Sequence, residues 1–311
     1  MIVTVTPNPS LDRTLQVDRL EVGRVNRTTS ARTDAGGKGV NVSRALAAHH
    51  IDTRAVVPMG GSAGRELGSL LTDIGVSVVP VPVNGQTRTN VTLVDEHGVV
   101  TKVNEAGAQL GPSAMVELVH RVEAAVHGAA WVASCGSLPP GAPTDLHATI
   151  TRTVHAAGAR VAVDTSGAPL AAAVEAGPDL VKPNLHELEE LVGQALSDVP
   201  AVVAASQELR RRGVGAVLTS LGADGAVLVN AQGAWHAVAP AIVVRSDVGA
   251  GDAALAGFLA AGARGPTALS QAVAWGTAAV AQPGTAMPTP DDVDLGAVVL
   301  TNLTTAVAPT A

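Results

Sequence analysis

From residue 131 onward, short apolar runs alternate with longer segments in which apolar residues recur at helical spacing. Because strands that alternate with helices are typical of βαβ units, the pattern predicts an α/β protein with a mostly parallel sheet covered on both faces. Ile2–Thr6 predicts a further core strand. The other strands are expected at 131–134, 160–164, 180–182, 216–220 and 226–229, and the helices at 144–157, 185–192 and 202–212.

Two earlier segments have a different pattern. Leu11 to Asp34 and Val91 to Val103 alternate polar and apolar residues and contain many charges, which fits strands with one exposed face. We expect them to form a small sheet apart from the core, either a lid or ordinary edge hairpins. The predicted division is a main domain of residues 1–9, 34–87 and 105–300, a lid of 10–33 and 88–104, and a flexible tail of 301–311.

Residues 242–258 combine strand, turn and helix signals in the order that builds an anion site. The β-branched run Ile242–Val244 predicts a buried strand, two glycines predict a turn, and Ala253–Phe258 predicts a packed helix. The first N–H groups of such a helix lack intrahelical partners and attract anions. Asp252 places a carboxylate beside them. That arrangement suits a general base, although an aspartate in a first turn is also favoured as a helix cap.

Two named nucleotide motifs do not fit. Gly249, Gly251 and Ala254 match the loose dinucleotide pattern, but the ribose-binding acid expected ~20 residues later is missing, since no Asp or Glu lies between Asp252 and Asp291. Gly37-Lys38 is followed by glycine and not by the Ser or Thr of a phosphate-binding P-loop. The dehydrogenase and P-loop interpretations are therefore disfavoured.

Other candidate residues follow the predicted strands. A glycine loop, Ala35–Gly39, contains Lys38 and opens a helix, so it offers amide donors and a point charge. Asn184 and Glu187 share a face at a helix start, which suits a hydrated Mg²⁺ or a helix cap. Ligands of parallel sheets bind beyond the carboxyl ends of the strands. The segments expected there are 136–141, 164–166, 182–184, 220–222 and the Gly249 loop.

Composition narrows the classes of function. A net charge of −7 gives no basic field for nucleic acid or membranes, and the near absence of aromatic residues removes base-stacking platforms. The single cysteine, Cys135, excludes an internal disulfide framework. The N-terminal apolar run is too short for a signal sequence, and the uncharged stretch 265–290 is interpreted as a buried helix and loop. We expect a soluble cytoplasmic protein.

Eight segments in order resemble the PfkB group of ribokinase-like sugar kinases, and within it the 1-phosphofructokinases and tagatose-6-phosphate kinases. They cover nearly the whole chain: TPNPSLDRT (6–14), AGGKGVNVSRAL (35–46), GQTRTNV (85–91), GSLPPG (136–141), DTSG (164–167), KPNLHELEEL (182–191), SLGADGA (220–226) and DVGAGDAALAGF (247–258). The resemblance implies a ribokinase-like three-layer α/β/α sandwich with a small β-sheet lid. Asp247 and Ala254 depart from the family, where Thr or Ser and Met or Val are common, and Asp247 adds a negative charge near the nucleotide.

The same resemblance implies ATP-dependent phosphoryl transfer to a sugar-phosphate hydroxyl. It assigns Asp252 as the base and Gly249, Ala250 and Gly251 as the anion hole. Asp12, Gly37, Lys38 and Asn41 would hold the sugar, and Arg88 and Lys38, with Arg27 and Ser137, its phosphate. ATP would bind at Ser220, Leu221, Gly222, Ala223, Asp224 and Gly225 with Lys182 and Asn184, and Mg²⁺ at Glu187 and Asn184.

Several functions stay open at this point. The leading one converts fructose 1-phosphate and ATP to fructose 1,6-bisphosphate and ADP. Lys38 in its glycine loop favours this activity or tagatose-6-phosphate kinase over 6-phosphofructokinase, whose loop tends to be all glycine. A non-catalytic sugar-phosphate and nucleotide-binding regulator is the alternative of another class, and Asp252 argues against it. An exposed face or edge of the lid would be covered by a second copy in a homodimer.

Overall fold

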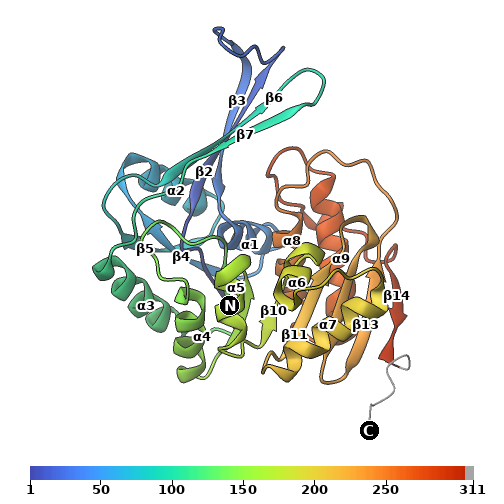
Figure 1. Cartoon of the computed structure of the whole chain (residues 1–311). Helices are drawn as coiled ribbons and strands as arrows, with labels where there is room; N and C mark the ends of the chain where they lie inside the picture. The colour runs from blue at the N-terminus through green and yellow to red at the C-terminus, as the bar shows by residue number, and fades with distance from the viewer. Residues whose placement is uncertain (305–311) are drawn as a thin grey trace.

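A ten-stranded sheet forms the centre of the molecule in the computed structural model, which describes residues 1–304 (Figure 1). The strand order is β14-β13-β12-β11-β10-β9-β8-β1-β4-β5. Within this order, all strands from β11 through β1 to β5 run parallel to one another. Strands β12, β13 and β14 continue the sheet as antiparallel strands. The strands are β1 (Ile2–Val5), β4 (Thr53–Met59), β5 (Ser77–Pro82), β8 (Trp131–Cys135), β9 (Arg160–Asp164), β10 (Leu180–Val181), β11 (Ala216–Ser220), β12 (Ala226–Asn230), β13 (Gly233–Val238) and β14 (Val299–Asn302).

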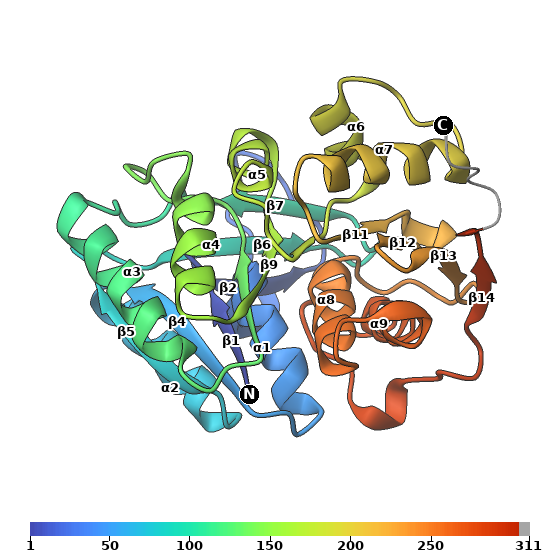
Figure 2. The ribbon, with the colours of Figure 1, turned by 90° about the horizontal axis from the view of Figure 1, so that it is seen from below.

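Helices cover both faces of this sheet (Figure 2). One layer contains α3 (Pro112–Val126), α4 (Leu146–Ala156), α5 (Gly167–Val174), α6 (Leu185–Val192) and α7 (Val199–Arg211). The other contains α1 (Lys38–Ala48), α2 (Gly61–Asp73), α8 (Ala250–Ala260) and α9 (Gly265–Val280). Each layer of helices encloses a hydrophobic core against the sheet: the first core lies under α3 to α7, and the second lies under α1, α8 and α9. Side chains alternate between the two faces along each strand, so Val3 and Val5 pack into the first core and Ile2 packs into the second. The predicted α/β/α sandwich is confirmed.

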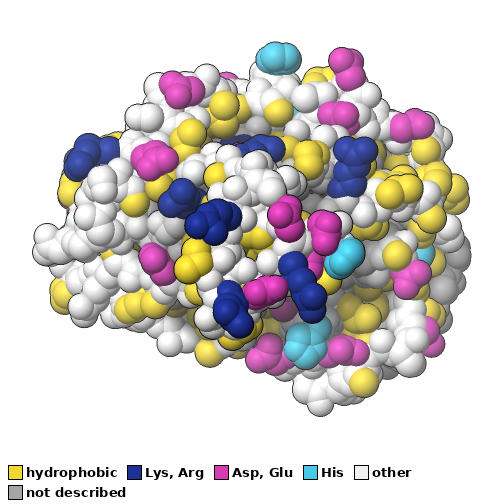
Figure 3. Space-filling model, turned by 90° about the horizontal axis from the view of Figure 1, so that it is seen from above, with side chains coloured by type: hydrophobic (Ala, Val, Ile, Leu, Met, Phe, Trp, Pro, Cys, Tyr) yellow, Lys and Arg dark blue, Asp and Glu magenta, His cyan; other side chains and the backbone are white. Residues whose placement is uncertain are grey.

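A second sheet stands away from the main body (Figure 1). Its strands, in the order β3-β2-β6-β7, are β2 (Ser10–Val17), β3 (Thr28–Gly36), β6 (Arg88–Val94) and β7 (Val100–Asn104). They come from the two segments predicted to form a separate sheet. The outer half of β3 and all of β7 are exposed. Figure 3 views the molecule from the side of the second sheet, and acidic and basic side chains are interspersed there without a large area of one sign.

Two predictions about secondary structure are wrong. Ile242–Val244 is not a strand and is exposed; β13, which precedes it in the chain, is already paired with β12 and β14. Arg245 and Ser246 instead donate their backbone N–H groups to the carbonyl of Val280. Thr301 and Asn302, predicted to be flexible, pair with β13 as part of β14. The rest of that predicted tail, from 305 onward, lies outside the described residues.

The uncharged stretch from residue 265 forms the buried helix α9 and a following loop, as predicted, with the short 3-10 helix η2 (Pro290–Asp292) at its end. Trp275 and Leu269 of α9 pack against α8 in the second core. Within residues 1–304, no helix is both long and apolar enough to cross a membrane.

Candidate active site

A cavity of about 550 Å³ lies where the parallel strands end, at the base of the second sheet. The loops after β1, β8, β9 and β10 and the end of β11 at Ser220 reach it, which is the position that ligands take in parallel α/β sheets. Strands β2 and β6 contribute from the other side. Its lining is mostly polar and includes Asn8, Ser10, Asp12, Gly37, Lys38, Asn41, Arg88, Asn90, Asn104, Ser137, Thr165, Ser166, Lys182, Asn184, Glu187, Ser220, Gly249, Gly251 and Asp252.

Asp252 lies in the first turn of α8, with its carboxylate buried at the cavity wall. Its Oδ2 accepts a hydrogen bond of 2.9 Å from Nδ2 of Asn41, and it makes no cap bond to its own helix. Burial raises the pKa of Asp252 to about 6, and the negative charge of Asp164 adds to the rise. The structure therefore does not support the capping interpretation. A carboxylate with a pKa just below neutrality is ionised at pH 7 and still able to accept a proton.

The start of α8 offers the donors that the sequence predicted. Gly249 is the N-cap with φ +85°, a left-handed conformation that favours glycine, so the chain can turn sharply into the helix. The first N–H groups of a helix lack intrahelical partners. A Cβ on Gly251 would lie 3.2 Å from Nζ of Lys182, so this ammonium group stands beside the helix start. Backbone donors and a cation therefore converge next to the Asp252 carboxylate.

Asp164, at the end of β9, joins two lysines. Its Oδ1 lies 2.7 Å from Nζ of Lys38, and its Oδ2 lies 2.8 Å from Nζ of Lys182. Burial alone would favour the neutral acid, but Lys182 and Lys38 outweigh it and hold the pKa of Asp164 below its usual value. Attraction by Asp164 raises the pKa of Lys38 in turn. The sequence placed Asp164 near the site, whereas only the structure identifies it as the partner of both cations.

Arg88 at the start of β6 forms the other positive side of the cavity. Its guanidinium donates to the carbonyls of Asn8 at 3.0 Å and Glu105 at 3.3 Å, while its Nε is buried without a partner among residues 1–304. Burial lowers the pKa of Arg88, but a guanidinium stays charged at any physiological pH. Because Arg88 lines the cavity and carries a positive charge, it favours an anion there.

Asp12 lies on β2, where the second sheet joins the cavity. Its Oδ1 accepts hydrogen bonds from Oγ of Ser10 at 2.8 Å and from Nδ2 of Asn90 at 2.9 Å. A carboxylate held in this way is suited to accept hydrogen bonds from the hydroxyl groups of a polyol.

Asn184 and Glu187 form a reciprocal capping box at the start of α6. The Asn184 side chain accepts from the N–H of Glu187 at 2.8 Å, and Glu187 Oε2 accepts from the N–H of Asn184 at 2.9 Å. The capping alternative is therefore correct, and both residues also line the cavity. No group of three or more metal-ligating side chains occurs in the described part of the chain. Glu187 keeps one oxygen outside the cap, which fits a Mg²⁺ held mostly by water and phosphate.

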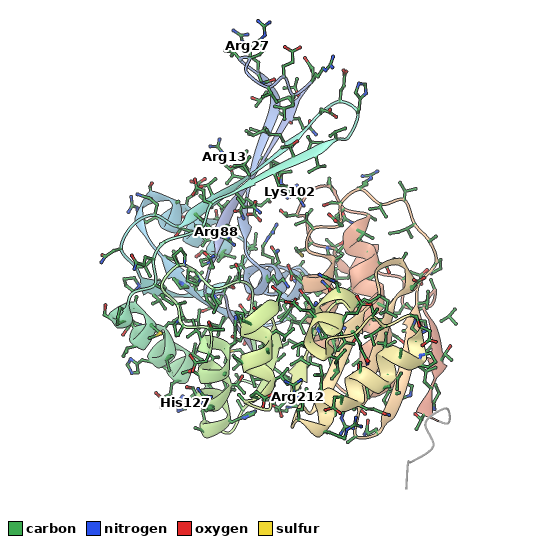
Figure 4. All side chains as sticks on the ribbon, in the orientation of Figure 1. Arg13, Arg27, Arg88, Lys102, His127 and Arg212 are labelled. Carbon is green, nitrogen blue, oxygen red and sulfur yellow. The ribbon has the colours of Figure 1, made fainter. Side chains whose placement is uncertain are left out.

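Most of the predicted site residues line this single cavity, but three groups do not. Leu221–Gly225 lie beside it in the turn after Ser220, which contains the 3-10 helix η1 (Gly222–Asp224). Ala250 lies in the first turn of α8 without lining the cavity. Arg27 sits at the far end of the second sheet, remote from Arg88 (Figure 4). Arg27 therefore does not line the cavity of its own chain, because the β2–β3 hairpin points away from it.

Sequence reasoning missed several lining residues. Asn8, Ser10 and Asn90 fall inside the segments that carry the family resemblance, but those motifs assign them no role. Asn104 is a further polar residue, at the end of β7 beside the cavity. Their presence beside recognised segments was the available signal. Their direction into the cavity depends on how two sheets meet.

Comparison with known proteins identifies the family. A model described as "pfkB family carbohydrate kinase" matches residues 6–292. The chain belongs to the pfkB carbohydrate kinase family. It is 40% identical over 281 residues to a 1-phosphofructokinase of Xanthomonas campestris pv. campestris, covering 89% of this chain and 88% of the relative. It is also 40% identical to a 1-phosphofructokinase of Rhodobacter capsulatus, covering 85% of this chain and 84% of that one.

Among solved structures, phosphofructokinase-2 from Escherichia coli in complex with fructose-6-phosphate matches with a TM-score of 0.87 and 33% identity, covering 94% of this chain and 96% of that chain. The same protein has been solved in a tetrameric inhibited form. As a member of the pfkB family, the chain is an ATP-dependent sugar kinase that transfers a phosphoryl group to an alcohol.

Proposed function

We propose that this pfkB family kinase phosphorylates fructose 1-phosphate with ATP, giving fructose 1,6-bisphosphate and ADP. The observation that supports the proposal most directly is that the buried carboxylate of Asp252 lines the same cavity as Lys38 and Arg88. A base is needed for the acceptor hydroxyl, and cations are needed for a substrate that already holds a phosphate. The 1-phosphofructokinases that are 40% identical over most of both chains support the choice of substrate.

In the proposed reaction, the sugar hydroxyl oxygen attacks the γ-phosphorus of ATP while its proton moves to the carboxylate of Asp252. The bond between the γ-phosphorus and the β–γ bridging oxygen breaks, and ADP leaves with that oxygen. Only Oδ2 of Asp252 is bonded to Asn41, so the other oxygen can accept the proton. As general base, Asp252 would contribute on the order of 10²–10⁴ in rate.

Positive groups around Asp252 offset the charge on the transferred phosphoryl. The N–H groups at Gly249–Gly251 and the ammonium of Lys182 lie next to the carboxylate. Donors that are already in position need no reorganisation during the reaction, so they stabilise the transition state more than the bound substrates. We assign the ATP phosphates to this end of the cavity, with Ser220 and the following turn, Leu221–Gly225, beside them.

The sugar phosphate is assigned to the side of the cavity lined by β2, β6 and the start of α1. Arg88, Ser137 and Lys38, which line the cavity, would hold the phosphate. Asp12 and Asn41 would accept and donate hydrogen bonds to sugar hydroxyls. Gly37 has φ +108°, and a Cβ there would lie 2.8 Å from Cγ2 of Thr6, so glycine is what lets the chain turn into Lys38 at the cavity wall.

Glu187 is the residue that we assign to Mg²⁺, with Asn184 holding the carboxylate in place through the capping box. When bound with ATP, the ion would neutralise charge on the phosphates. A Mg²⁺ site of one carboxylate completed by water and substrate oxygens needs no further protein ligand.

Release of ADP with a panel of acceptors tests the assignment and its alternatives. We expect kcat/KM to be highest with fructose 1-phosphate. A higher value with tagatose 6-phosphate or fructose 6-phosphate would support the corresponding kinase; phosphofructokinase-2, the structural relative, was solved with fructose-6-phosphate. Tight binding of both ligands without ADP release would support a regulator.

We also propose a homodimer formed through the lid, in the cytoplasm where ATP and sugar phosphates are found. The second sheet and its β6–β7 turn expose several valines, among them Val99, Val100 and Val103, which a second copy could cover. The tetrameric form of phosphofructokinase-2 supports oligomer formation in this family. A monomeric mass in analytical ultracentrifugation, at concentrations where the enzyme is active, would overturn the dimer.

A further inference from the structure

Arg44 is a buried arginine that lies on α1 one turn after Asn41. Its Nη1 donates to Oδ1 of Asn41 at 3.1 Å and to the carbonyl of Ala35 at 3.0 Å. Its Nη2 lies 3.4 Å from Oδ1 of Asp34. Arg44 does not line the cavity, so it touches the site only through other residues.

The chemistry of the guanidinium decides which way the Asn41 amide faces. A guanidinium can only donate hydrogen bonds, so the Asn41 atom beside it must be the oxygen. The amide nitrogen then faces Asp252, to which it donates at 2.9 Å. A donor stabilises the ionised carboxylate, whereas the reversed amide would present an oxygen and favour the protonated acid. A protonated acid cannot act as a base.

We propose that Arg44 is a positioning residue for phosphoryl transfer, which fixes the amide of Asn41 so that its N–H group faces the general base Asp252. This inference rests on the proposed role of Asp252. The distances that carry it are those from Arg44 to Asn41 and from Asn41 to Asp252.

Asp34 links Arg44 to the second sheet. It lies on β3, and its Oδ1 also accepts hydrogen bonds from Nη2 of Arg32 at 2.7 Å and from its Nε at 3.1 Å. Arg32 is half exposed, whereas Arg44 is buried. A continuous set of contacts therefore runs from the surface of β3 through Asp34 and Arg44 to the site.

Other charged groups also act on the two ends of this chain of contacts. Besides burial, which raises the pKa of Asp252, the charge of Asp164 raises it and the charges of Lys38 and Lys182 lower it. Burial lowers the pKa of Arg44. Among the charged groups, Asp34, Asp12 and Asp252 raise it and Arg32 lowers it. None of these groups is removed when Arg44 is replaced. The positive charge of Arg44 also acts on Asp252, and Arg44→Met removes it, whereas Arg44→Lys keeps it. A change in pH dependence that Arg44→Lys shares therefore reports the Asn41–Asp252 contact.

The test compares Arg44→Met and Arg44→Lys with the unchanged enzyme. Methionine keeps an apolar stem and removes the donors, whereas lysine keeps one donor group. For Arg44→Met we expect kcat to fall about 10- to 100-fold, as for other small misplacements of a reacting group, with little change in the Kd of ATP. We also expect the acidic limb of the pH profile of kcat/KM to move up by roughly one pH unit, the size of effect of one hydrogen bond to a carboxylate. For Arg44→Lys we expect a kcat and an acidic limb between those of Arg44→Met and those of the unchanged enzyme.

A double-variant cycle separates positioning from a general structural role. In an Asn41→Ala background, Arg44→Met should lower kcat little further, because the amide that Arg44 holds is gone. Equal losses in both backgrounds, or an acidic limb that does not move, would overturn the inference. If Arg44→Met does not fold, Arg44→Lys in the same two backgrounds decides by the same criteria.

Arg160→Met is the matched control. Arg160 is a partly buried arginine with its guanidinium 4.4 Å from the centre of the Trp131 ring, and it starts β9 at the end away from the cavity. The Arg160→Met substitution should lower the melting temperature without moving the acidic limb of the pH profile. Failure of the proposed function is seen separately: if Asp252→Asn keeps turnover, Asp252 is not the base, whatever the Arg44 variants do.

Discussion

The amide of Asn41 donates to the carboxylate of Asp252 across 211 positions of sequence, at 2.9 Å. Asn41 lies in the first turn of α1 and Asp252 in the first turn of α8, and the two helices pack side by side on one face of the sheet. Both follow glycine-rich turns. The contact joins the glycine loop assigned to the sugar with the one assigned to phosphoryl transfer.

Replacing Asp252 by asparagine should remove nearly all turnover and leave binding intact. The amide keeps the shape of the side chain but cannot accept the hydroxyl proton, so kcat should fall by at least about 10²-fold. Kd values for ATP and fructose 1-phosphate, measured by calorimetry, should change little. An Asn variant with near-normal kcat would falsify the assignment of the base.

The same substitution should stabilise the protein. The pKa of Asp252 is raised from 3.8 to about 6 by burial, so the ionised carboxylate destabilises the folded state at pH 7. Its removal should increase the free energy of unfolding by about 1–3 kcal/mol, measured by urea denaturation. The gain should shrink as the pH falls through 6 and vanish below 3.8. A gain that is independent of pH would show that charge burial is not its cause.

Activity should depend on the ionisation of Asp252. Because the carboxylate must be deprotonated to act as a base, kcat/KM should fall about tenfold per pH unit below roughly pH 6. The stability of the enzyme should be checked at each pH by circular dichroism. Burial lowers the pKa of His147 to about 4, but His147 lies outside the cavity lining. A limb near 4 in place of 6 would point to another group as the base.

Lys38→Ala and Arg88→Ala should weaken binding of the sugar phosphate more than binding of ATP. Each removes a charge-assisted hydrogen bond worth about 1.5–3 kcal/mol, so Kd for fructose 1-phosphate should rise roughly 10- to 100-fold. Separate titrations with each ligand measure the difference. Arg212→Ala is the control, since Arg212 bonds Glu175 on the surface far from the cavity (Figure 4). Equal losses for both ligands would contradict the assignment.

Asp164→Ala should destabilise the fold. It leaves the buried ammonium of Lys182 without its partner, which typically costs about 3–5 kcal/mol. Urea denaturation of the single variant and of Asp164→Ala with Lys182→Met measures this. The second substitution should recover part of the loss, because it removes the unpaired charge. No recovery in the double variant would mean that packing, and not the charge, accounts for the loss.

Part of the site could be read from local patterns because each pattern reflects local backbone chemistry. The glycines before Lys38 and Asp252, and the Asn184–Glu187 spacing, describe single turns and helix starts. Ile242–Val244 shows where this fails: a β-branched run becomes a strand only if a neighbouring strand is available to pair with. The roles of Asp164 and Arg44 were also hidden, since their partners come from distant segments.

The sequence by itself determined the α/β class, most of the element order, and the set of chemical groups available for kinase chemistry, because hydrophobic period and turn residues act over a few positions. The tertiary structure alone decided that Asp164 holds two lysines, that Asn41 faces Asp252, and that Arg27 lies away from the cavity. Those facts depend on which strand ends meet, and that is set by packing across the whole sheet.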